Sequence, residues 1–309
     1  MHTDQPPVSR LVLLLGLGMT TFAFAPILVR FAGDTDPVFL ATIRTVSAAL
    51  MLLPFWLRMR MRDAQSGTEV RAWSRADNLT AVAAGFFLAL HFVLWFASLS
   101  FTSVASASVL VTIHPIILIV VESATGSGRF GRLTWFGVFV AFSGSVLLGV
   151  MDTDPAATYS NPVLGNALAV GAAVMFVFYL LLSRKLRAKG GWLDFVFRVY
   201  AGTAAGCLLI LLIMRPSTDA TLMAWVCGLA LALGPQILGH GSLNYSVKYV
   251  APTLLSTLIL VEPVFAIVLA GFLFSEIPSF AESAAMMVIM TGVGLSWVGG
   301  SATPKIKGQ

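Results

Sequence analysis

Glu262 is an acidic residue in the middle of a long apolar run, directly before Pro263. A charge at the centre of a bilayer costs about 2.5–3.5 kcal/mol even on the more lenient insertion scale, so this side chain should face a bundle interior or water. One interpretation is a carboxyl that couples proton movement or contacts a substrate. The other is a carboxyl that hydrogen-bonds to a neighbouring helix, and the sequence leaves both open.

Two residue pairs are spaced so that the members of each pair share one helix face. Trp95 follows His91 by one helical turn, and His240 follows Gln236 in the same way. An imidazole beside an indole suits an aromatic or zwitterionic ligand, through stacking and a titratable hydrogen bond. A hydrogen bond between helices is the alternative role for the histidine. The residues that we predict to bind substrate are His91, Trp95, Thr20, Phe24, Phe176, Tyr179 and Gln236.

Two prolines follow residues that could act in gating. Pro115 follows His114, and Pro263 follows Glu262. A proline inside a helix removes one backbone hydrogen bond and pushes the helix off its axis. The sequence therefore predicts a coupling or gating role for these four residues, with a static kink as the alternative.

Arg44 and Arg198 each lie about two turns inside an apolar run. We predict structural charges at both positions. Snorkelling of the guanidinium groups to the membrane surface would explain them. The alternative is a structural or gating ion pair, for which Asp194 is the nearby candidate beside Arg198.

The composition places these residues in a membrane protein. Of 309 residues, 58% are hydrophobic and 11% are charged, whereas about a quarter of a soluble domain is charged. A helix needs about 20 apolar residues to cross the hydrocarbon core, and a barrel would show an alternation that these runs lack. The sequence therefore predicts an all-α integral membrane protein with ten transmembrane helices, in runs 11–31, 37–57, 78–98, 104–121, 133–150, 161–182, 193–214, 222–244, 252–274 and 280–300.

The two halves of the chain resemble each other. Residues 22–24 match residues 176–178, and His114-Pro115 takes the position that Glu262-Pro263 takes later. Five helices per copy is an odd number, so the second copy must cross the membrane in the opposite sense. The sequence predicts two inverted five-helix repeats, residues 1–150 and 151–309, around a central cavity.

Basic and acidic residues fall on different sides of the predicted bundle. With the N-terminus inside, most of the 19 Lys and Arg residues lie in inner loops, whereas Asp34 and Asp152 lie in outer loops. The positive-inside rule then predicts cytoplasmic N- and C-termini, and the membrane that we expect is a plasma membrane, the bacterial inner membrane. Because the positive charge follows the membrane face and its anionic lipid heads, the expected partners are the lipid bilayer and a small-molecule substrate, not nucleic acid.

Sequence signatures of enzymes are absent. There is no glycine-rich run ending in Lys-Ser or Lys-Thr, no His-Glu-x-x-His and no Gly-x-Ser-x-Gly. We therefore expect no catalytic residue, no cofactor and no bound metal, and we expect Cys207 and Cys227 to be free packing residues. Small residues at Gly202–Gly206 predict close helix packing or a dimer contact, so we expect a monomer or a weak homodimer.

Several stretches carry a family resemblance. Residues 101–115, the helix of Arg44 and above all residues 262–266 and 275–276 resemble the EamA-type proteins of the drug/metabolite transporter superfamily. The resemblance implies a ten-helix bundle around a central cavity that exports small metabolites. The setting of His91 in residues 89–92 is similar to that in a bacterial aromatic amino-acid exporter of this superfamily.

The first half departs from the family pattern at two places. His114 stands where the second half carries Glu262, and residues 122–131 replace the usual Gly-Glu ending. These departures make the motif of the first half less specific than that of the second.

Together these features predict a secondary transporter that exports small metabolites by alternating access, chiefly amino acids with aromatic or hydrophobic side chains. Efflux of cationic drugs is the alternative among transporters, because the charge of Glu262 would then matter more than His91. An intramembrane enzyme acting on lipid-linked substrates is the alternative of another class. It needs a close acid/base pair, and the sequence offers only Glu262 and scattered histidines.

Overall fold

The computed structural model describes residues 6–66, 73–102, 104–151, 160–262, 264–265 and 279–300, and all regular secondary structure within them is helical. This agrees with the predicted all-α class. The helices are α1 (Val8–Ala23), α2 (Ala25–Phe31), α3 (Pro37–Ser66), α4 (Arg75–Ser98), α5 (Val104–Val111), α6 (His114–Ala124), α7 (Arg132–Met151), α8 (Pro162–Arg187), α9 (Trp192–Met214), α10 (Leu222–Leu231), the π-helix η1 (Ala232–His240), α11 (Gly241–Ser246), α12 (Pro252–Ile259) and α14 (Phe280–Gly299).

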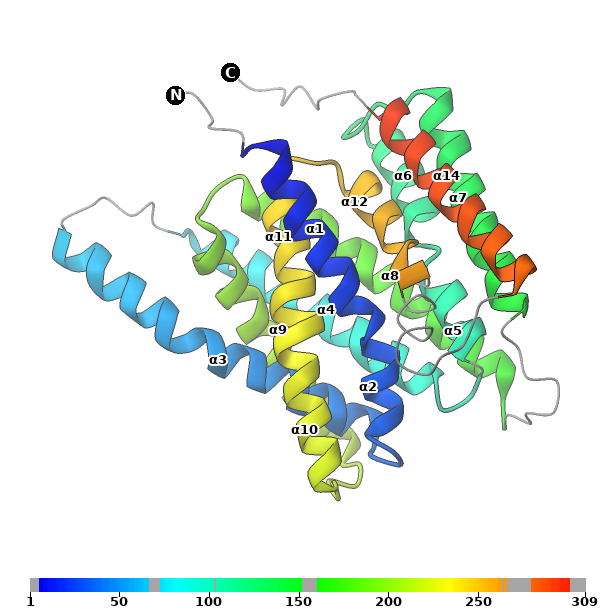
Figure 1. The fold of residues 1–309 in the computed structure, drawn as a ribbon. Coiled ribbons are helices and arrows are strands. Elements are labelled where there is room, and N and C mark those ends of the chain that lie inside the picture. The colour runs from blue at the N-terminus through cyan, green and yellow to red at the C-terminus, as the bar shows by residue number, and fades with distance from the viewer. Residues whose placement is uncertain are drawn as a thin grey trace.

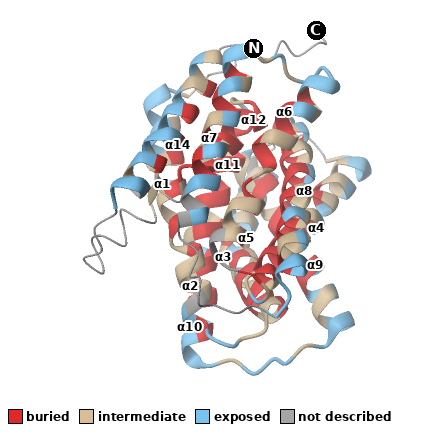
Figure 2. Cartoon of the chain, turned by 90° about the vertical axis from the view of Figure 1, so that its right-hand side faces the viewer, coloured by how far each residue is buried: buried red, intermediate tan, exposed pale blue. Residues whose placement is uncertain are grey.

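Seven helical stretches within the described residues have the length and hydropathy that crossing a bilayer requires. They are Val8–Val29, Pro37–Gln65, Arg75–Ser98, Ser106–Ala124, Pro162–Arg187, Trp192–Met214 and Leu222–Ser246, and two shorter apolar helices occupy Arg132–Leu147 and Ser283–Gly299. Large apolar side chains such as Leu212, Ile213 and Leu222 lie exposed on the outside. Burial is concentrated in the middle of the bundle (Figure 2), so the outer surface suits contact with hydrocarbon.

Local sequence signals set several helix ends. The Ser74 hydroxyl accepts a hydrogen bond from the Asp77 backbone N–H, and the Asp77 carboxylate accepts one from the Ser74 N–H, which forms a capping box at the start of α4. The Asn161 side chain caps α8 in a similar way, ahead of Pro162. Helix α9 ends at Arg215, whose backbone takes the left-handed conformation with φ 48°.

Close helix packing arranges the core around α4. Helix α4 packs against α8 and α9, while α3 packs against α9 and α10, α1 against η1, and α7 against α14. Gly202 and Gly206 of α9 lie directly against Val82, Phe86 and Ala89 of α4. The small-residue face of α9 is therefore used within the chain, which confirms the packing prediction and removes this face as a dimer contact.

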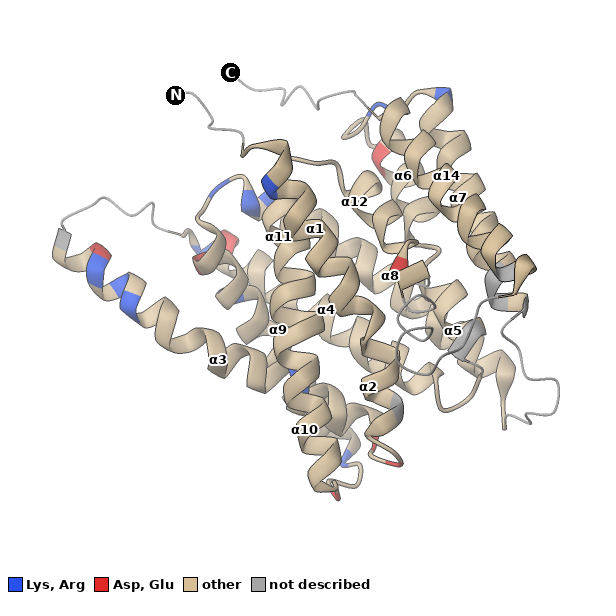
Figure 3. Cartoon of the chain, viewed as in Figure 1, with Lys and Arg blue, Asp and Glu red and all other residues tan. Residues whose placement is uncertain are grey.

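The start of α1 and the end of α14 lie at the same end of the molecule (Figure 1). Charged residues are rare in the interior, and many basic residues lie on the protruding part of α3 and on loops near that end (Figure 3). Helix α3 continues past the predicted run 37–57 through the basic stretch that contains Arg58, Arg60 and Arg62.

Candidate functional site

Three histidines from separate helices meet around Phe176 of α8. The ring centroid of Phe176 lies 5.0 Å from that of His91 on α4, 4.7 Å from that of His114 on α6 and 6.0 Å from that of His240 on η1. All four side chains are buried. We call these residues, with Phe22, Phe92 and Tyr179 whose rings also contact His240, the ring cluster.

The π-helix η1 presents two polar residues to the ring cluster. Pro235 lies inside it and has no backbone N–H to donate, and the wider π turn accommodates that missing bond. Gln236 and His240 follow on the same segment and are both buried. Wide turns of this kind change the side-chain register along a helix and are frequent at functional sites.

Arg44 of α3 lies inside the bundle and not at its surface. Its residue is 1% exposed, its Nε donates a hydrogen bond of 3.0 Å to the Gln236 Oε1, and its guanidinium lies 3.8 Å from the centre of the Phe92 ring. The snorkelling prediction is therefore wrong for Arg44. The side chain is held in the core by an amide and by a cation–π contact.

Two tyrosines and a backbone carbonyl complete the polar contacts of this region. The Tyr179 hydroxyl donates to the Asn244 Oδ1 at 2.8 Å, and the Tyr200 hydroxyl donates to the Gln236 carbonyl oxygen at 2.5 Å. The His91 Nδ1 lies 3.0 Å from the Ala172 carbonyl oxygen. Because a carbonyl only accepts, this contact assigns the proton to Nδ1 and leaves Nε2 as an acceptor.

Several buried polar atoms in and beside the ring cluster have no hydrogen-bond partner among the described residues. They are the Trp95 Nε1, His114 Nδ1, Gln236 Nε2, His240 Nδ1 and Asn244 Nδ2. Buried polar groups are nearly always hydrogen-bonded in folded proteins, so a group of exceptions calls for a partner such as a ligand or water. Of the predicted substrate-binding residues, the structure brings His91, Phe176, Tyr179 and Gln236 together, and Trp95 follows His91 on the same helix.

The two candidates from the first helix stand apart from this arrangement. The Thr20 hydroxyl donates to the Gly16 carbonyl oxygen of its own helix at 2.9 Å. Phe24 is half-buried at the end of α1, whereas Phe22 is buried with its ring 4.9 Å from that of His240. Phe22, and not the predicted Phe24, therefore contributes a ring of the first helix to the ring cluster.

The structure places Pro115 just after an interruption of the predicted run 104–121. Helix α5 ends at Val111, a turn follows at residues 112–113, and α6 begins at His114 within the stretch Ser106–Ala124. Pro115 thus occupies the first turn of a new helix, where its missing N–H costs no hydrogen bond. A similar turn at residues 260–261 precedes Glu262, which is half-buried, and Pro263 lies outside the described residues.

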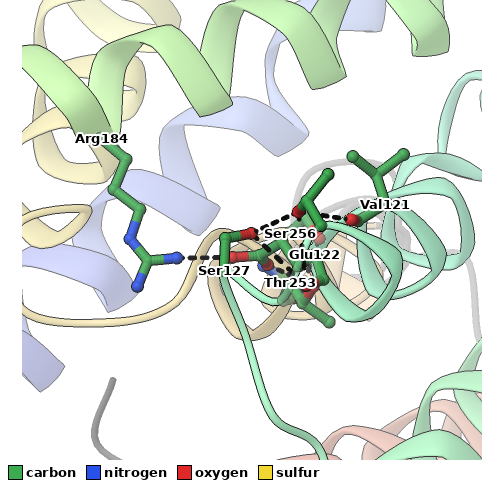
Figure 4. Close-up of polar contacts among 7 residues, drawn as sticks. Val121, Glu122, Ser127, Arg184, Thr253 and Ser256 are labelled. Carbon is green, nitrogen blue, oxygen red and sulfur yellow. Dashed lines mark hydrogen bonds and ion pairs between the residues drawn. The ribbon is translucent and has the colours of Figure 1, made fainter. Parts of the chain in front are cut away.

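A second polar site joins α6, α8 and α12 around Glu122 (Figure 4). The fully buried Glu122 accepts a 2.5 Å hydrogen bond from Arg184 on one carboxylate oxygen. Its other oxygen accepts bonds from the Thr253 backbone N–H at 2.9 Å and the Thr253 hydroxyl at 2.6 Å. We call Glu122, Arg184 and Thr253 the carboxylate bridge. It lies at the end of the molecule where α14 ends, because the Trp297 indole donates to the carbonyl oxygen of Leu254.

The carboxylate bridge was not among the predicted sites. Glu122 stood out in the sequence only as a departure from a family pattern, and Arg184 only as one of several inner-loop cations. The signal that could have found it was an acidic residue at the end of an apolar run, where a lone buried carboxylate needs a partner.

Arg198 forms the ion pair that the sequence proposed. Its guanidinium lies 3.2 Å from the Asp194 carboxylate, one turn earlier on α9, and it donates to the Asn78 Oδ1 at 2.7 Å. The Trp56 indole donates to the same aspartate at 2.7 Å. This network ties α3 to the first turns of α4 and α9.

Two other features of the described residues bear on chemistry. No group of three or more His, Cys, Asp or Glu side chains within the described ranges could hold a metal ion, and Cys207 and Cys227 are both free and buried, as predicted. A surface groove borders the protruding end of α3, away from the ring cluster, and is lined by Phe55, Arg58, Met59, Arg62, Asp63 and Leu193.

Comparisons with known proteins agree with a transporter. The sequence matches the EamA-like transporter family over residues 9–150 and 163–298. Two relatives from Bacillus subtilis (strain 168) are similar to it. The uncharacterized transporter YxxF is 21% identical, over 84% of this chain and 80% of YxxF. The uncharacterized transporter YdfC is 24% identical, over 90% of this chain and 87% of YdfC. The crystal structure of another protein matches this chain with a TM-score of 0.76 at 18% identity, over 95% of this chain and 99% of that protein's chain. That last likeness shows a shared fold.

Proposed function

Because this chain belongs to the EamA-like transporter family and is a multi-pass membrane protein, we propose that it is a secondary transporter that exports amino acids by alternating access. Aromatic and other hydrophobic amino acids are the proposed substrates. The observation that carries this proposal is the ring cluster, a buried set of aromatic and polar side chains inside a bundle whose outer face is apolar.

The chemistry of the ring cluster supports an amino acid as substrate. Rings of His91, Phe176 and Tyr179 offer faces and edges on which an aromatic side chain can stack. The unpartnered nitrogens of Gln236 and His240 offer polar contacts within the same region. Because the buried cation Arg44 contacts the Phe92 ring of this cluster, the site is better suited to a zwitterion than to a cationic drug.

The proposed topology has ten transmembrane helices in two inverted repeats, residues 1–150 and 151–309, with both termini in the cytoplasm of a bacterial cell. It is supported by the position of the α1 start and the α14 end on one side of the molecule (Figure 1). It is also supported by the matching turns before His114 and Glu262, which we propose as paired hinges. Labelling of engineered cysteines that places the two termini on different sides of the membrane would defeat this topology.

The carboxylate bridge supplies a way to close the inner side. Under this topology Glu122 links three helices on the cytoplasmic side, while the ring cluster behind it is closed off from solvent, with His91 only 8% exposed. Opening toward the cytoplasm would require these hydrogen bonds to break. We therefore assign the structure to a state whose inner side is closed by the carboxylate bridge.

An efflux experiment in cells tests the proposed function. Cells that express the chain are loaded with labelled phenylalanine or with a labelled quaternary cation, and the rate of loss is compared with that of empty-vector cells. Faster loss of phenylalanine alone supports the proposal. Faster loss of the cation alone would establish the alternative, and conversion of a lipid-linked compound would point to an enzyme.

A further inference from the structure

Arg44 is a buried cation that forms no ion pair within the described part of the chain. Its residue is 1% exposed, and no carboxylate among the described residues lies within 4.0 Å of its guanidinium. Burying an unpaired charge is costly, so such cations in protein interiors are normally paired. The half-buried arginines Arg184 and Arg198 have carboxylate partners, Glu122 and Asp194. The other buried arginine, Arg187, instead donates to the backbone carbonyl oxygens of Asn244 and Gly190.

The contacts of Arg44 hold its planar group in one orientation. Gln236 accepts from Nε, and the Phe92 ring supports one face of the guanidinium at 3.8 Å. A guanidinium fixed in this way presents its remaining N–H groups as a fork that matches the two oxygens of a carboxylate. A role in packing alone would not need these N–H groups.

Unpartnered nitrogens lie beside this fork. The Gln236 oxygen accepts from Arg44, which assigns its Nε2 as a donor, and this nitrogen is buried without a partner. The ring of His240 lies 5.2 Å from that of Phe92, and its buried Nδ1 is also unpartnered. The Gln236 donor beside a fixed cation suits a ligand group that only accepts hydrogen bonds, as a carboxylate does, and a neutral His240 that carries its proton on Nδ1 would add a second donor.

The acidic residue Glu262 leaves Arg44 unpaired. Its carboxylate forms no ion pair with Arg44 within 4.0 Å. A substrate whose carboxylate is held by Arg44 would lie beside the ring cluster, because Arg44 contacts the Phe92 ring. The side chain of the substrate would then contact the rings of Phe176 and His91.

We propose that Arg44, together with the Gln236 amide, binds the free carboxylate of the transported substrate. This inference rests on the proposed transport function and names the chemical group that the site selects. Amino acids and small aromatic acids satisfy it, whereas their esters and amides do not.

Matched ligands test the carboxylate site in the unaltered protein. Equilibrium binding to the purified full chain is measured for phenylalanine against phenylalaninamide, and for 3-phenylpropionate against its amide. Each acid is expected to bind at least about tenfold more tightly than its amide, since a buried charged contact is lost in the amide. An acid that binds no more tightly than its binding amide, in either pair, overturns the proposal, and so does the absence of binding by both acids.

Variants of Arg44 add an independent test. Arg44→Gln should abolish the preference for acid over amide, and Arg44→Lys should retain part of it, because lysine keeps the charge but loses the fork. Arg60→Gln, at an exposed position on the same helix, is the matched control and should behave as the unaltered protein. An acid preference that survives in Arg44→Gln overturns the proposal.

The ligand pairs also separate this inference from the proposed function. Binding of 3-phenylpropionate without binding of phenylalanine leaves the carboxylate site standing and defeats the assignment to amino acids. Equal transport of phenylalanine and phenylalaninamide defeats the carboxylate site and leaves the assignment to amino acids standing.

Discussion

Replacing Glu122 by glutamine should open the inner side of the protein. The substitution keeps the size of the side chain and removes its charge. Glu122 accepts one hydrogen bond from Arg184 and two from Thr253. An amide has a single acceptor oxygen, so it can serve Thr253 or Arg184 but not both, and its NH₂ group then faces a donor.

The magnitude follows from these three bonds. Hydrogen bonds to charged groups contribute about 1.5–3 kcal/mol each, and neutral ones about 1 kcal/mol. The best arrangement of the glutamine loses the bond to Arg184 and weakens the two from Thr253. Because the Arg184 side chain is 22% exposed and solvated, the lower part of the range applies. The expected loss is about 2–3 kcal/mol, which shifts the equilibrium between the closed and open states by about 30- to 150-fold.

Cysteine labelling measures this shift. Ser183 is fully buried on α8, one turn beyond Tyr179, and Ser183→Cys can be made after both native cysteines are replaced by alanine. A membrane-impermeant maleimide applied from the cytoplasmic side should label this cysteine at least about tenfold faster in Glu122→Gln, as the shifted equilibrium requires.

The control for this experiment is Asp77→Asn. It makes the same chemical change in an ion pair with Lys189, which lies at the surface, and it should leave the labelling rate unchanged because surface pairs contribute little. Equal labelling rates in Glu122→Gln and in the unaltered background, with the protein still folded by gel filtration, would refute the role of the carboxylate bridge in closing the inner side.

Three further substitutions test other parts of the account. Asp194→Asn should lower the melting temperature in detergent, because it removes the ion pair with Arg198 and weakens the hydrogen bond from Trp56. The expected loss of stability is about 1–2 kcal/mol, and an unchanged melting temperature would contradict this prediction. Gly292→Ala should also lower the melting temperature, through a loss of about 1–3 kcal/mol of stability, because the added Cβ would overlap the backbone of Ala141 where α14 packs against α7. An unchanged melting temperature would show that these helices can separate. Pro235→Ala restores a backbone N–H and should convert the π turn to an α-helix, so phenylalanine efflux should fall at least about tenfold in a folded protein, and an unchanged rate would dissociate the π turn from transport.

The helical runs could be predicted because hydropathy reports the length of chain that must lie in hydrocarbon. The predicted run 193–214 corresponds to α9, Trp192–Met214, and the break at residues 215–216 is where that helix ends. The extension of α3 to Ser66 was missed, because it continues through basic residues that a hydropathy criterion excludes. The turn that separates α5 from α6 was also missed, since Thr112 and Ile113 do not differ in hydropathy from a helix interior.

The site was predicted less completely, because hydropathy does not report which way a side chain faces. Phe22 and Phe24 differ by two positions and so lie on opposite faces of α1, and only the fold shows which face meets His240. The sequence offered snorkelling or an ion pair for Arg44, and neither describes the amide and ring contacts that hold it in the core. Glu122 has its partners 62 and 131 residues away, and nothing local in the sequence joins them.

Counterflow in proteoliposomes tests the central claim most directly. Liposomes that contain the purified protein are loaded with unlabelled phenylalanine and diluted into a trace of labelled phenylalanine. A carrier that alternates access exchanges one for the other, so the account predicts a transient accumulation of label inside, above the level in protein-free liposomes. Uptake that never exceeds the protein-free level, from protein that is folded and incorporated, would contradict it.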